Sequence, residues 1–273
     1  MKIAVLGCGA IGSIIVESIC SGEIRNAELT ALMDIYPDKC EKILENYCPT
    51  VKANISICRD LDCMFNSKPQ LVVEAASQKA VEEYIPKILS RGINTVILSV
   101  GALLDENTLQ EIKQACMKSG SRVYIPTGAI AGLDAVKALS NKGIKRIVLR
   151  TYKNVYSFDK NTLEKLGFKE VTAKTKIYEG RGDVAVKLFS ANVNVVAALS
   201  LAAGVIPWVE VYADPELKRN IHEIEVESNV STIYIRVENT PHPLNPKTSY
   251  LAALSALQLL KRIVVEEPIE VGT

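Results

Sequence analysis

A glycine-rich segment near the N-terminus has the composition of a site that binds the phosphates of a nucleotide. Residues 7–12 read Gly-Cys-Gly-Ala-Ile-Gly and follow the apolar run 3–6. A pyrophosphate must lie against backbone amides at the start of a helix, with no side chain in the way. Gly7 permits the tight turn out of the strand, Gly9 lets the backbone approach the phosphates, and Gly12 lets the helix lie close to the sheet. The segment therefore predicts a dinucleotide-binding turn.

An acidic residue lies at the distance from this turn at which such proteins hold the adenosine ribose. Asp34 ends a second apolar run and follows Gly12 at about the 20-residue spacing of a carboxylate that accepts hydrogen bonds from the ribose hydroxyls. The 2′-phosphate of NADP would meet a like charge there, and residues 35–37 contain no arginine. The pattern favours NAD as the cofactor, with NADP as an alternative.

Only two histidines are available as proton carriers. Period-two alternation over residues 221–226 places His222 on the same, apolar face as Ile224, while the glutamates of this run lie on the other face. An inward histidine is either a hydrogen-bonded core residue or a catalytic group, since its ordinary pKa of about 6.5 suits proton transfer. His242 lies between two prolines and is interpreted as a surface-loop residue.

Small and polar residues follow two of the expected strands. Ligands of an open parallel sheet lie at the carboxyl ends of its strands, so residues 75–78 and 99–102 would face the nicotinamide half of the cofactor. Ala76 and Ser77 are the candidate contacts in the first of these segments. The alternative interpretation is that small residues only allow a helix to pack closely on its strand.

Three further segments have both a structural and a functional interpretation. Asn192 and Asn194 are either N-caps of an Ala-rich helix or amides that orient a carboxylate or a carboxamide. Residues 128–134 form a second glycine-bearing turn, which is a hinge or a backbone contact to the ligand. Residues 245–249, Asn-Pro-Lys-Thr-Ser, would put a cation, hydroxyls and free amides at a helix start, which suits an anion.

The elements that would position these residues alternate between strand and helix in the first half of the chain. Strand-like runs end near residues 6, 34, 76, 100 and 126, with a shorter one around residue 55 and helix-like segments between them. Asp105 is the expected N-cap of one helix, and Gly120 lies past its end. This alternation is typical of a mainly parallel sheet with crossover helices.

The second half of the chain has longer strand-like runs. Alternating runs predict strands over 144–152, 208–212, 221–226 and 233–237, and helix-like segments cover 182–189 and 193–203. This order is typical of an antiparallel or mixed sheet with helices on one face. A last helix, over 247–263 and begun after Pro246, is expected to pack back on the first domain.

The expected fold class is therefore α/β, with a Rossmann-type dinucleotide-binding domain and a second α+β domain that has a mixed or antiparallel sheet. The first domain would comprise residues 1–126 plus about 245–273. The second, residues 127–244, would serve catalysis, substrate binding and dimerisation.

Composition and charge exclude several classes of protein. The 273 residues are 48% hydrophobic and 23% charged, with a formal net charge of +1, as in an ordinary globular protein. There is no basic block interleaved with aromatic residues, so nucleic acid is not an expected partner. The apolar stretches are too short to span a bilayer, and the N-terminal run leads into the glycine turn rather than a cleavage site. We expect a cytoplasmic protein without a membrane partner.

The seven cysteines are odd in number and include no CxxC pair. A disulfide framework or a zinc site would need unusual geometry, since Cys8 lies inside the phosphate turn. Reduced and mostly buried thiols are expected.

Several of these segments, together and in order, resemble the L-aspartate dehydrogenase family. The matching segments are 7–12, 99–103, 127–135, 191–195, the strand around His222, and 238–239 through 245–249. Their combination is far more specific than the glycine pattern alone, which many dehydrogenases share. The resemblance implies that NAD(P) oxidises L-aspartate to iminoaspartate, which gives oxaloacetate and ammonia or enters quinolinate synthesis in NAD biosynthesis.

The resemblance also implies roles for individual residues, with the catalytic histidine at His222 and cofactor contacts at Ala129 and Asn192. Together with the positions predicted above, the cofactor-binding set is Gly7, Gly9, Ala10, Ile11, Gly12, Asp34, Ala76, Ser77, Ala129 and Asn192. Candidate donors to the two substrate carboxylates are Asn194, Lys247 and Thr248. His222 would take the proton of the amine and later assist the attack of water on the imine. No metal is expected, because these steps need only orientation and a proton carrier.

Two positions depart from the family pattern. Ser190 replaces the usual proline, and residues 151–153 read Thr-Tyr-Lys where the family often has Thr-Arg-Lys. The second departure leaves open whether any arginine binds substrate there.

Two alternatives remain beside this interpretation. One is a related dehydrogenase or reductase, similar to homoserine dehydrogenase or dihydrodipicolinate reductase, although the latter carries a His-His pair that this chain lacks. The other is a non-catalytic NADH-sensing protein, which the near-neutral charge disfavours. A homodimer is expected, because symmetric dimers are the commonest assemblies.

Overall fold

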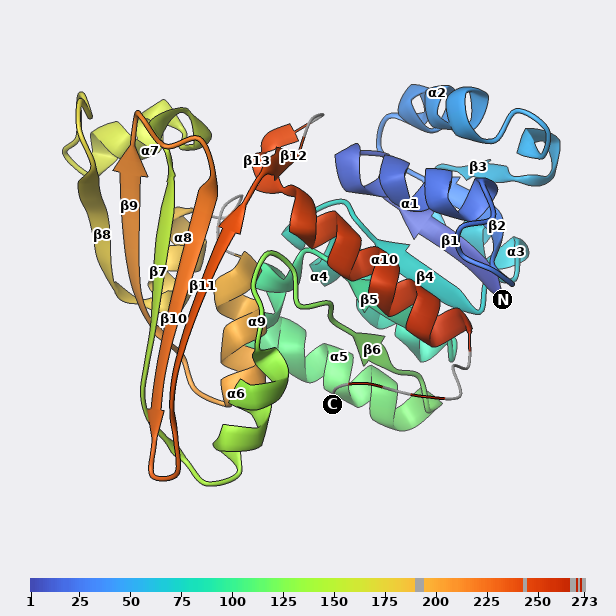
Figure 1. Ribbon diagram of the computed structural model, residues 1–273. Helices are drawn as coiled ribbons and strands as arrows, with labels where there is room; N and C mark the ends of the chain where they lie inside the picture. The colour runs from blue at the N-terminus through green and yellow to red at the C-terminus, as the bar shows by residue number, and fades with distance from the viewer. Residues whose placement is uncertain (190–193, 243–244, 266–268, 270, 272–273) are drawn as a thin grey trace. The chain divides into compact units, whose positions relative to one another are not determined.

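The chain forms two compact units in the computed structural model (Figure 1), which describes residues 1–189, 194–242, 245–265, 269 and 271, without the side chains of 242 and 245–248. Unit 1 holds Met1–Pro126 and the C-terminal helix from Ala253, and unit 2 holds Thr127–Ala252. None of the helices in these described ranges is long and apolar enough to cross a membrane.

A six-stranded parallel sheet is the centre of unit 1, with strand order β3-β2-β1-β4-β5-β6. The strands are β1 (Lys2–Leu6), β2 (Glu28–Met33), β3 (Ser56–Cys58), β4 (Leu71–Glu74), β5 (Asn94–Ile97) and β6 (Val123–Tyr124). The helices are α1 (Ala10–Cys20), α2 (Pro37–Tyr47), α3 (Leu61–Asn66), α4 (Gln78–Ser90), α5 (Glu106–Ser119) and α10 (Tyr250–Val264). The strand order reverses between β1 and β4, which is where ligands bind in such sheets. The Rossmann-type sheet predicted from the alternation is confirmed.

The C-terminal helix α10 belongs to the core of unit 1. Its Leu257 and Leu260 are buried in the same apolar cluster as Ile15 of α1. At the surface, Lys261 of α10 pairs with Glu23 at 2.8 Å. A segment at the end of the chain therefore completes a domain formed mainly by the first 126 residues.

The predicted start of this last helix is wrong. Residues Asn245–Ser249 form a strand, β13, that pairs antiparallel with β12 (Pro241–His242), and the helix begins at Tyr250. The backbone N–H of Tyr250 donates to the carbonyl of Thr240 at 3.0 Å. Strand pairing thus prevails over the preference of Pro246 for a helix start, and a proline is tolerated in a short edge strand. His242, expected in a surface loop, has its backbone in β12.

Unit 2 contains a five-stranded sheet of order β11-β10-β7-β9-β8. The strands are β7 (Ile144–Asn154), β8 (Thr175–Arg181), β9 (Trp208–Asp214), β10 (Asn220–Ser228) and β11 (Thr232–Asn239). The helices are α6 (Leu133–Ser140), α7 (Lys160–Lys165), α8 (Gly182–Leu188) and α9 (Asn194–Ala203). Only β7 and β9 run parallel among these neighbours, so the sheet is mixed, one of the two arrangements expected. Strand β8 and helix α7 were not among the predicted elements.

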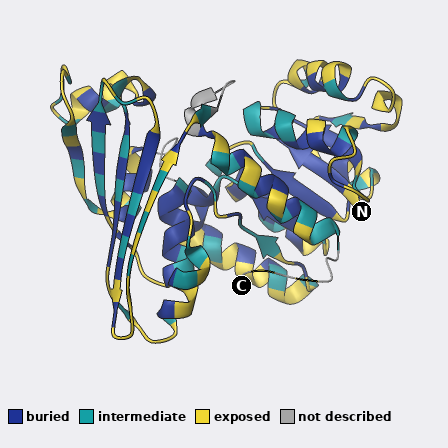
Figure 2. Cartoon of the chain, viewed as in Figure 1, coloured by how far each residue is buried: buried dark blue, intermediate teal, exposed yellow. Residues whose placement is uncertain are grey.

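The two faces of this second sheet differ in character. From His222 to Ser228 on β10, buried residues alternate with half-buried or exposed ones, and β7 shows a similar alternation from Leu149 to Asn154. Figure 2 shows the resulting stripes of buried residues along both strands. One face therefore belongs to the core of unit 2, and the other presents polar and aromatic side chains.

Six cysteines form disulfide bonds, contrary to the expectation of reduced thiols. The pairs are Cys8–Cys40, Cys20–Cys48 and Cys58–Cys63, and Cys116 is free. The first two pairs join residues separated by 32 and 28 positions in the sequence, yet their Cα atoms lie 5.4 Å apart. The phosphate turn and α1 lie beside α2 in the fold, a proximity that cysteine count and spacing do not reveal.

Candidate active site

The glycine turn has the geometry of a phosphate cradle. Gly7 has φ +107°, and a Cβ there would lie 2.6 Å from the backbone of Ala75. A Cβ at Gly12 would lie 2.0 Å from the carbonyl oxygen of Gly7. Gly9, in contrast, has no atom within 4 Å of the position of a Cβ. Gly7 and Gly12 thus make the close packing possible, and Gly9 leaves open the space that a pyrophosphate needs at the start of α1.

Asp34 is fixed to this turn by backbone hydrogen bonds. The N–H of Cys8 donates to Oδ2 of Asp34 at 2.7 Å, and the N–H of Tyr36 donates to Oδ1 at 2.9 Å. Each carboxylate oxygen has more than one lone pair, so acceptor capacity remains for ribose hydroxyls. The acidic residue and the glycine turn therefore form one preorganised structure.

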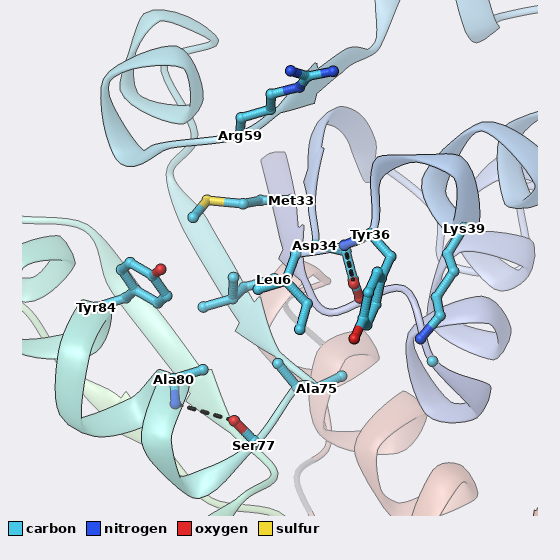
Figure 3. A pocket seen from close by; sticks show the side chains of 13 residues that line it. Leu6, Met33, Asp34, Tyr36, Lys39, Arg59, Ala75, Ser77, Ala80 and Tyr84 are labelled. Atoms are coloured by element: carbon cyan, nitrogen blue, oxygen red, sulfur yellow. Dashed lines mark hydrogen bonds between the residues drawn. The ribbon is translucent and has the colours of Figure 1, made fainter.

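A single pocket joins several of the predicted cofactor contacts (Figure 3). Gly9, Asp34, Ala76 and Ser77 all line it. Ser77 also has the structural role considered from sequence, since its Oγ caps α4 by accepting from the N–H of Ala80 at 3.2 Å. Ala10 and Ile11 begin α1. Sequence reasoning missed other residues of the lining, among them Lys39, Arg59 and Tyr84.

A buried carboxylate that the sequence reasoning missed ties together the ends of β4 and β5. Glu74 has no exposed surface. Its Oε1 accepts from the N–H of Ala76 and the hydroxyl of Ser99, both at 2.8 Å, and Oε2 accepts from the N–H groups of Leu98 at 3.2 Å and Ser99 at 2.9 Å. Burial raises the pKa of Glu74 above its ordinary value, while the four donors act in the opposite direction. Glu74 thereby positions both segments predicted to face the nicotinamide.

In unit 2, His222 lies on the buried face of the sheet, as the alternation predicts, and is 2% exposed. It is the direct neighbour of Thr151 on β7, and Oγ1 of Thr151 lies 3.1 Å from Nδ1 of the ring. This contact fixes the orientation of the imidazole and occupies Nδ1. Nε2 is then the nitrogen through which His222 would meet a substrate.

Lys153 is a second titratable group on this face. It follows Thr151 by two residues on β7 and is 4% exposed. Burial lowers the pKa of Lys153 to about 8. Burial, with a smaller contribution from the positive charge of Lys153, lowers the pKa of His222 to about 3. The imidazole is therefore neutral near pH 7, whereas the ammonium of Lys153 releases its proton in the mildly alkaline range.

Buried polar side chains continue this cluster. Asn220 lies on the same face of β10 as His222, and its Nδ2 is 3.3 Å from Oγ of Ser249. Asn239, opposite Asn220 on β11, donates from Nδ2 to the carbonyl of Ala129 at 2.9 Å. The turn that contains Ala129 is thus fixed to the strand pair that carries His222. We call Thr151, Lys153, Asn220, His222, Asn239 and Ser249 the polar cluster; each is buried.

The other predicted positions are only partly described. Asn194 is the first residue of α9. Asn192 lies outside the described residues, as do the side chains of Lys247 and Thr248. The backbone of these last two residues belongs to β13, so the predicted anion site at a helix start is wrong in its geometry. The polar segment is a strand instead.

Tyr152 explains one departure from the family pattern. It lies between Thr151 and Lys153 on β7 and therefore points to the opposite face of the sheet. There its hydroxyl donates to Glu223 at 2.9 Å, and its ring stacks on Tyr212. A residue at this position is directed away from His222, so the absence of arginine removes nothing from the polar cluster. Within the described ranges, no group of three or more His, Cys, Asp or Glu could hold a metal ion.

Comparison with known proteins adds independent information. Residues 7–126 match the family model "Homoserine dehydrogenase, NAD binding domain", and residues 134–263 match "Aspartate dehydrogenase, C-terminal". The chain is 40% identical to the L-aspartate dehydrogenase of Methanocaldococcus jannaschii and 39% identical to that of Methanococcoides burtonii, in each case over 100% of both chains. The crystal structure of aspartate dehydrogenase from Thermotoga maritima is similar, with a TM-score of 0.72 and 26% identity over 100% of this chain and 99% of that one.

Proposed function

Because the chain belongs to the L-aspartate dehydrogenase family, we propose that it oxidises L-aspartate with NAD(P) to iminoaspartate, which yields oxaloacetate and ammonia or is passed to quinolinate synthesis. The observation that carries the proposal is the buried polar cluster around His222, next to the fixed turn at Ala129. It supplies a neutral imidazole and a lysine of lowered pKa, which are the groups that oxidation of an amine needs.

The residues of unit 1 fit the cofactor. Gly9 leaves space for a pyrophosphate, and Asp34 holds acceptors for a ribose. When bound, the oxidised nicotinamide supplies the acceptor for a hydride. Ala129 and Asn192 stay proposed cofactor contacts. Asn194, Lys247 and Thr248 stay proposed donors to the substrate carboxylates.

His222 is proposed as a catalytic residue at the reacting carbon. A neutral ring held at Nδ1 by Thr151 presents Nε2 to the substrate. Water must then add to the imine carbon and lose a proton, and an imidazole can accept that proton if the bound carboxylates raise its pKa. Collapse of the adduct releases ammonia and leaves the ketone.

The test is a substrate panel followed by the absorbance of NADH. Purified protein is given NAD with L-aspartate, D-aspartate, L-glutamate, L-homoserine or no substrate. We expect reduction with L-aspartate alone, and oxaloacetate and ammonia in equal amounts. Reduction with L-homoserine in place of L-aspartate would assign the chain to another dehydrogenase reaction, and NADH binding without turnover on any substrate would favour a sensor.

Preference for NAD over NADP is part of the proposal and is supported by Asp34. Lys39 and Arg59, however, line the same pocket and could face a 2′-phosphate. Asp34→Ser should therefore raise the ratio of NADP to NAD efficiency by at least about tenfold, since it removes a repulsive charge and leaves the two cations in place. The ratio of kcat/KM for the two cofactors measures this, and an unchanged ratio would remove Asp34 from cofactor selection.

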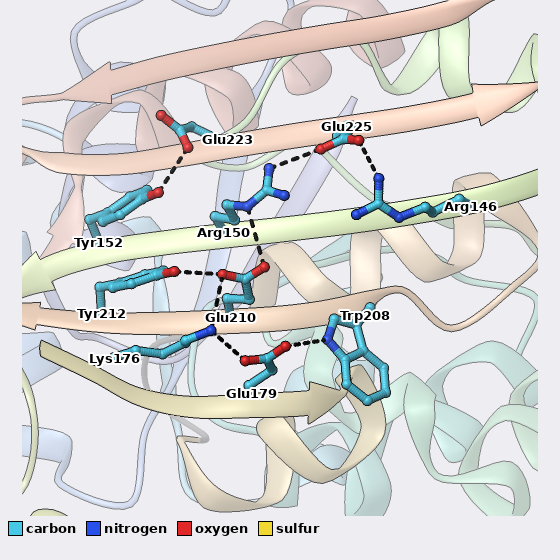
Figure 4. A network of polar contacts seen from close by, with 10 residues as sticks. All are labelled: Arg146, Arg150, Tyr152, Lys176, Glu179, Trp208, Glu210, Tyr212, Glu223 and Glu225. Carbon is cyan, nitrogen blue, oxygen red and sulfur yellow. Dashed lines mark hydrogen bonds and ion pairs between the residues drawn. The ribbon is translucent and has the colours of Figure 1, made fainter.

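A homodimer formed through unit 2 is also proposed. The face of the sheet opposite His222 carries a continuous polar network (Figure 4), in which Arg150 joins Glu210 at 3.3 Å and Glu225 at 3.0 Å. Tyr152 and Tyr212 stack beside it, and Trp208 at its edge is 46% exposed. Light scattering of the wild type and of Trp208→Glu tests this; a wild-type monomer would contradict the proposal.

Location in the cytoplasm is proposed from the cofactor, the substrate and the near-neutral charge. The three disulfide bonds argue against it, because such bonds are uncommon in reducing compartments. Fractionation of cells that express the natural protein decides whether it lies in the cytoplasm or in an oxidising compartment.

A further inference from the structure

Lys153 and His222 are diagonal neighbours on one buried sheet face. Thr151 lies directly opposite His222, and Lys153 is the next residue of β7 on that face. Diagonal neighbours in an antiparallel pair lie within reach of long side chains. The electrostatic effect of Lys153 on the pKa of His222 agrees with this placement. A lysine that is almost fully buried is rare in proteins and calls for a functional explanation.

We infer that Lys153, rather than His222, is the base that removes a proton from the α-ammonium group of the substrate before hydride transfer. The inference rests on the proposed oxidation of L-aspartate and divides that reaction between two residues. Lys153 prepares the amine, and His222 acts afterwards at the water molecule that attacks the imine.

The step balances in protons and electrons. A substrate N–H bond breaks and an N–H bond forms on the neutral Nζ of Lys153, which leaves the substrate amine with a lone pair. The Cα–H bond then breaks, its electron pair leaves as hydride for the oxidised nicotinamide, and the nitrogen lone pair forms the C=N bond. The substrate is oxidised by two electrons, the nucleotide is reduced, and Lys153 returns its proton to solvent.

The pKa values of Lys153 and His222 support this assignment. With a pKa of about 8, Lys153 is substantially neutral under mildly alkaline conditions and, once neutral, is a far stronger base than an imidazole whose pKa is about 3. An acceptor works best when its pKa lies near the operating pH.

Few other charges of unit 2 belong to the elements beside this face. Helix α9 contains no ionisable side chain. On α8, Asp183 pairs with Arg181 at 3.1 Å and Lys187 is exposed; on α6, Asp134 and Lys137 are exposed. The positive charge of Lys153 contributes to the lowered pKa of His222.

The experiment compares Lys153→Met, Lys153→Arg and the control Lys145→Met, an exposed lysine on the same strand. kcat/KM for L-aspartate is measured at saturating NAD from neutral to alkaline pH, with NADH binding and thermal unfolding as checks on the fold. For the wild type, kcat/KM should rise with pH to a plateau governed by a pKa near 8. Lys145→Met should behave as the wild type does.

Both substitutions of Lys153 should lower kcat/KM by about 10²- to 10⁴-fold, the usual contribution of a general base. Arginine keeps the positive charge but does not lose its proton, so it should be no better than methionine. The plateau should disappear, because only substrate that is already deprotonated in solution can react. A further variant, Lys153→Ala, tests the role of the amine directly, because added ethylamine should restore part of the rate of NAD reduction.

Three results would overturn the inference. The first is full activity in Lys153→Arg. The second is a low rate in Lys153→Met that keeps the wild-type pH profile, together with no rescue of Lys153→Ala by ethylamine. The third is a pH plateau that is lost in His222→Gln but kept in Lys153→Met. If the wild type itself fails to reduce NAD with L-aspartate, the proposed function is wrong and the role of Lys153 falls with it. The wild-type assay thus separates the two failures.

Discussion

At the scale of residues, the contact between Thr151 and His222 fixes the orientation of the ring that is proposed to act in catalysis. The imidazole is 2% exposed, and its Nδ1 lies 3.1 Å from Oγ1 of Thr151. The contact with Thr151 holds the ring in one orientation, in which the proposed mechanism uses Nε2.

The buried ring should make the protein sensitive to acid. The pKa of His222 is about 3 in the folded chain and 6.5 when unperturbed. Between these values the unfolded chain binds more protons than the folded one, so stability falls as the pH drops below about 6.5. His222 should contribute a loss of up to about 5 kcal/mol at strongly acidic pH. Urea unfolding of wild type and His222→Gln at neutral pH and near pH 5 measures this difference.

The variant should lose much of the acid sensitivity, whereas substitution of the only other histidine, His242→Gln, should leave it in place. Parallel losses of stability in wild type and His222→Gln would show that the ring is not held neutral.

At the scale of elements, Glu74 connects two strand ends that the cofactor would use. Glu74→Gln replaces a carboxylate oxygen by an NH₂ group that faces N–H donors, which costs about 1 to 3 kcal/mol for each buried group left unsatisfied. We expect a lower melting temperature and NADH binding weakened by about tenfold, since the loops at Ala76 and Ser99 lose their common anchor. Fluorescence titration with NADH measures the second effect. Glu106→Gln, in the exposed first turn of α5, is the control, and equal NADH affinity in both variants would contradict the role of Glu74.

The disulfide bonds should differ in their effect on stability. Loss of a disulfide destabilises more when it closes a longer loop. Replacing Cys8 and Cys40 by serine opens a loop of 32 positions and should cost about 4 kcal/mol, whereas the same change at Cys58 and Cys63, only 5 positions apart, should cost less. Urea unfolding without reductant ranks the two double variants, and a reversed order would contradict the loop argument.

The sequence predicts the site best where a ligand dictates residue spacing. The glycines and Asp34 follow the dimensions of a dinucleotide, and period two places His222 on the buried face. The sequence predicts poorly those features that depend on contacts between segments far apart in the chain. Glu74 and Lys153 are single residues whose meaning comes from burial, and the cysteine pairs come from the proximity of α1 and α2. The β12–β13 pair was missed because a proline after asparagine also fits a helix start.

At the scale of the whole molecule, two units contribute different chemistry. Unit 1 offers the glycine turn, Asp34 and Glu74, which fit a nucleotide. Unit 2 holds the polar cluster, in which His222 and Lys153 differ in pKa by several units on one sheet face. The C-terminal helix packs in the core of unit 1, so truncation before Ala253 would remove Leu257 and Leu260 from it.

The most direct measurement follows the hydrogen that leaves the substrate. L-Aspartate carrying deuterium at Cα is incubated with NAD and either wild type or His222→Gln, and the nucleotide is analysed by mass spectrometry over time. We predict that the wild type transfers the deuterium to the nucleotide and that the variant forms oxaloacetate and ammonia at least about 100-fold more slowly, with NADH affinity retained. Reduced nucleotide without deuterium, or equal rates of oxaloacetate and ammonia formation in the two proteins, would contradict the account.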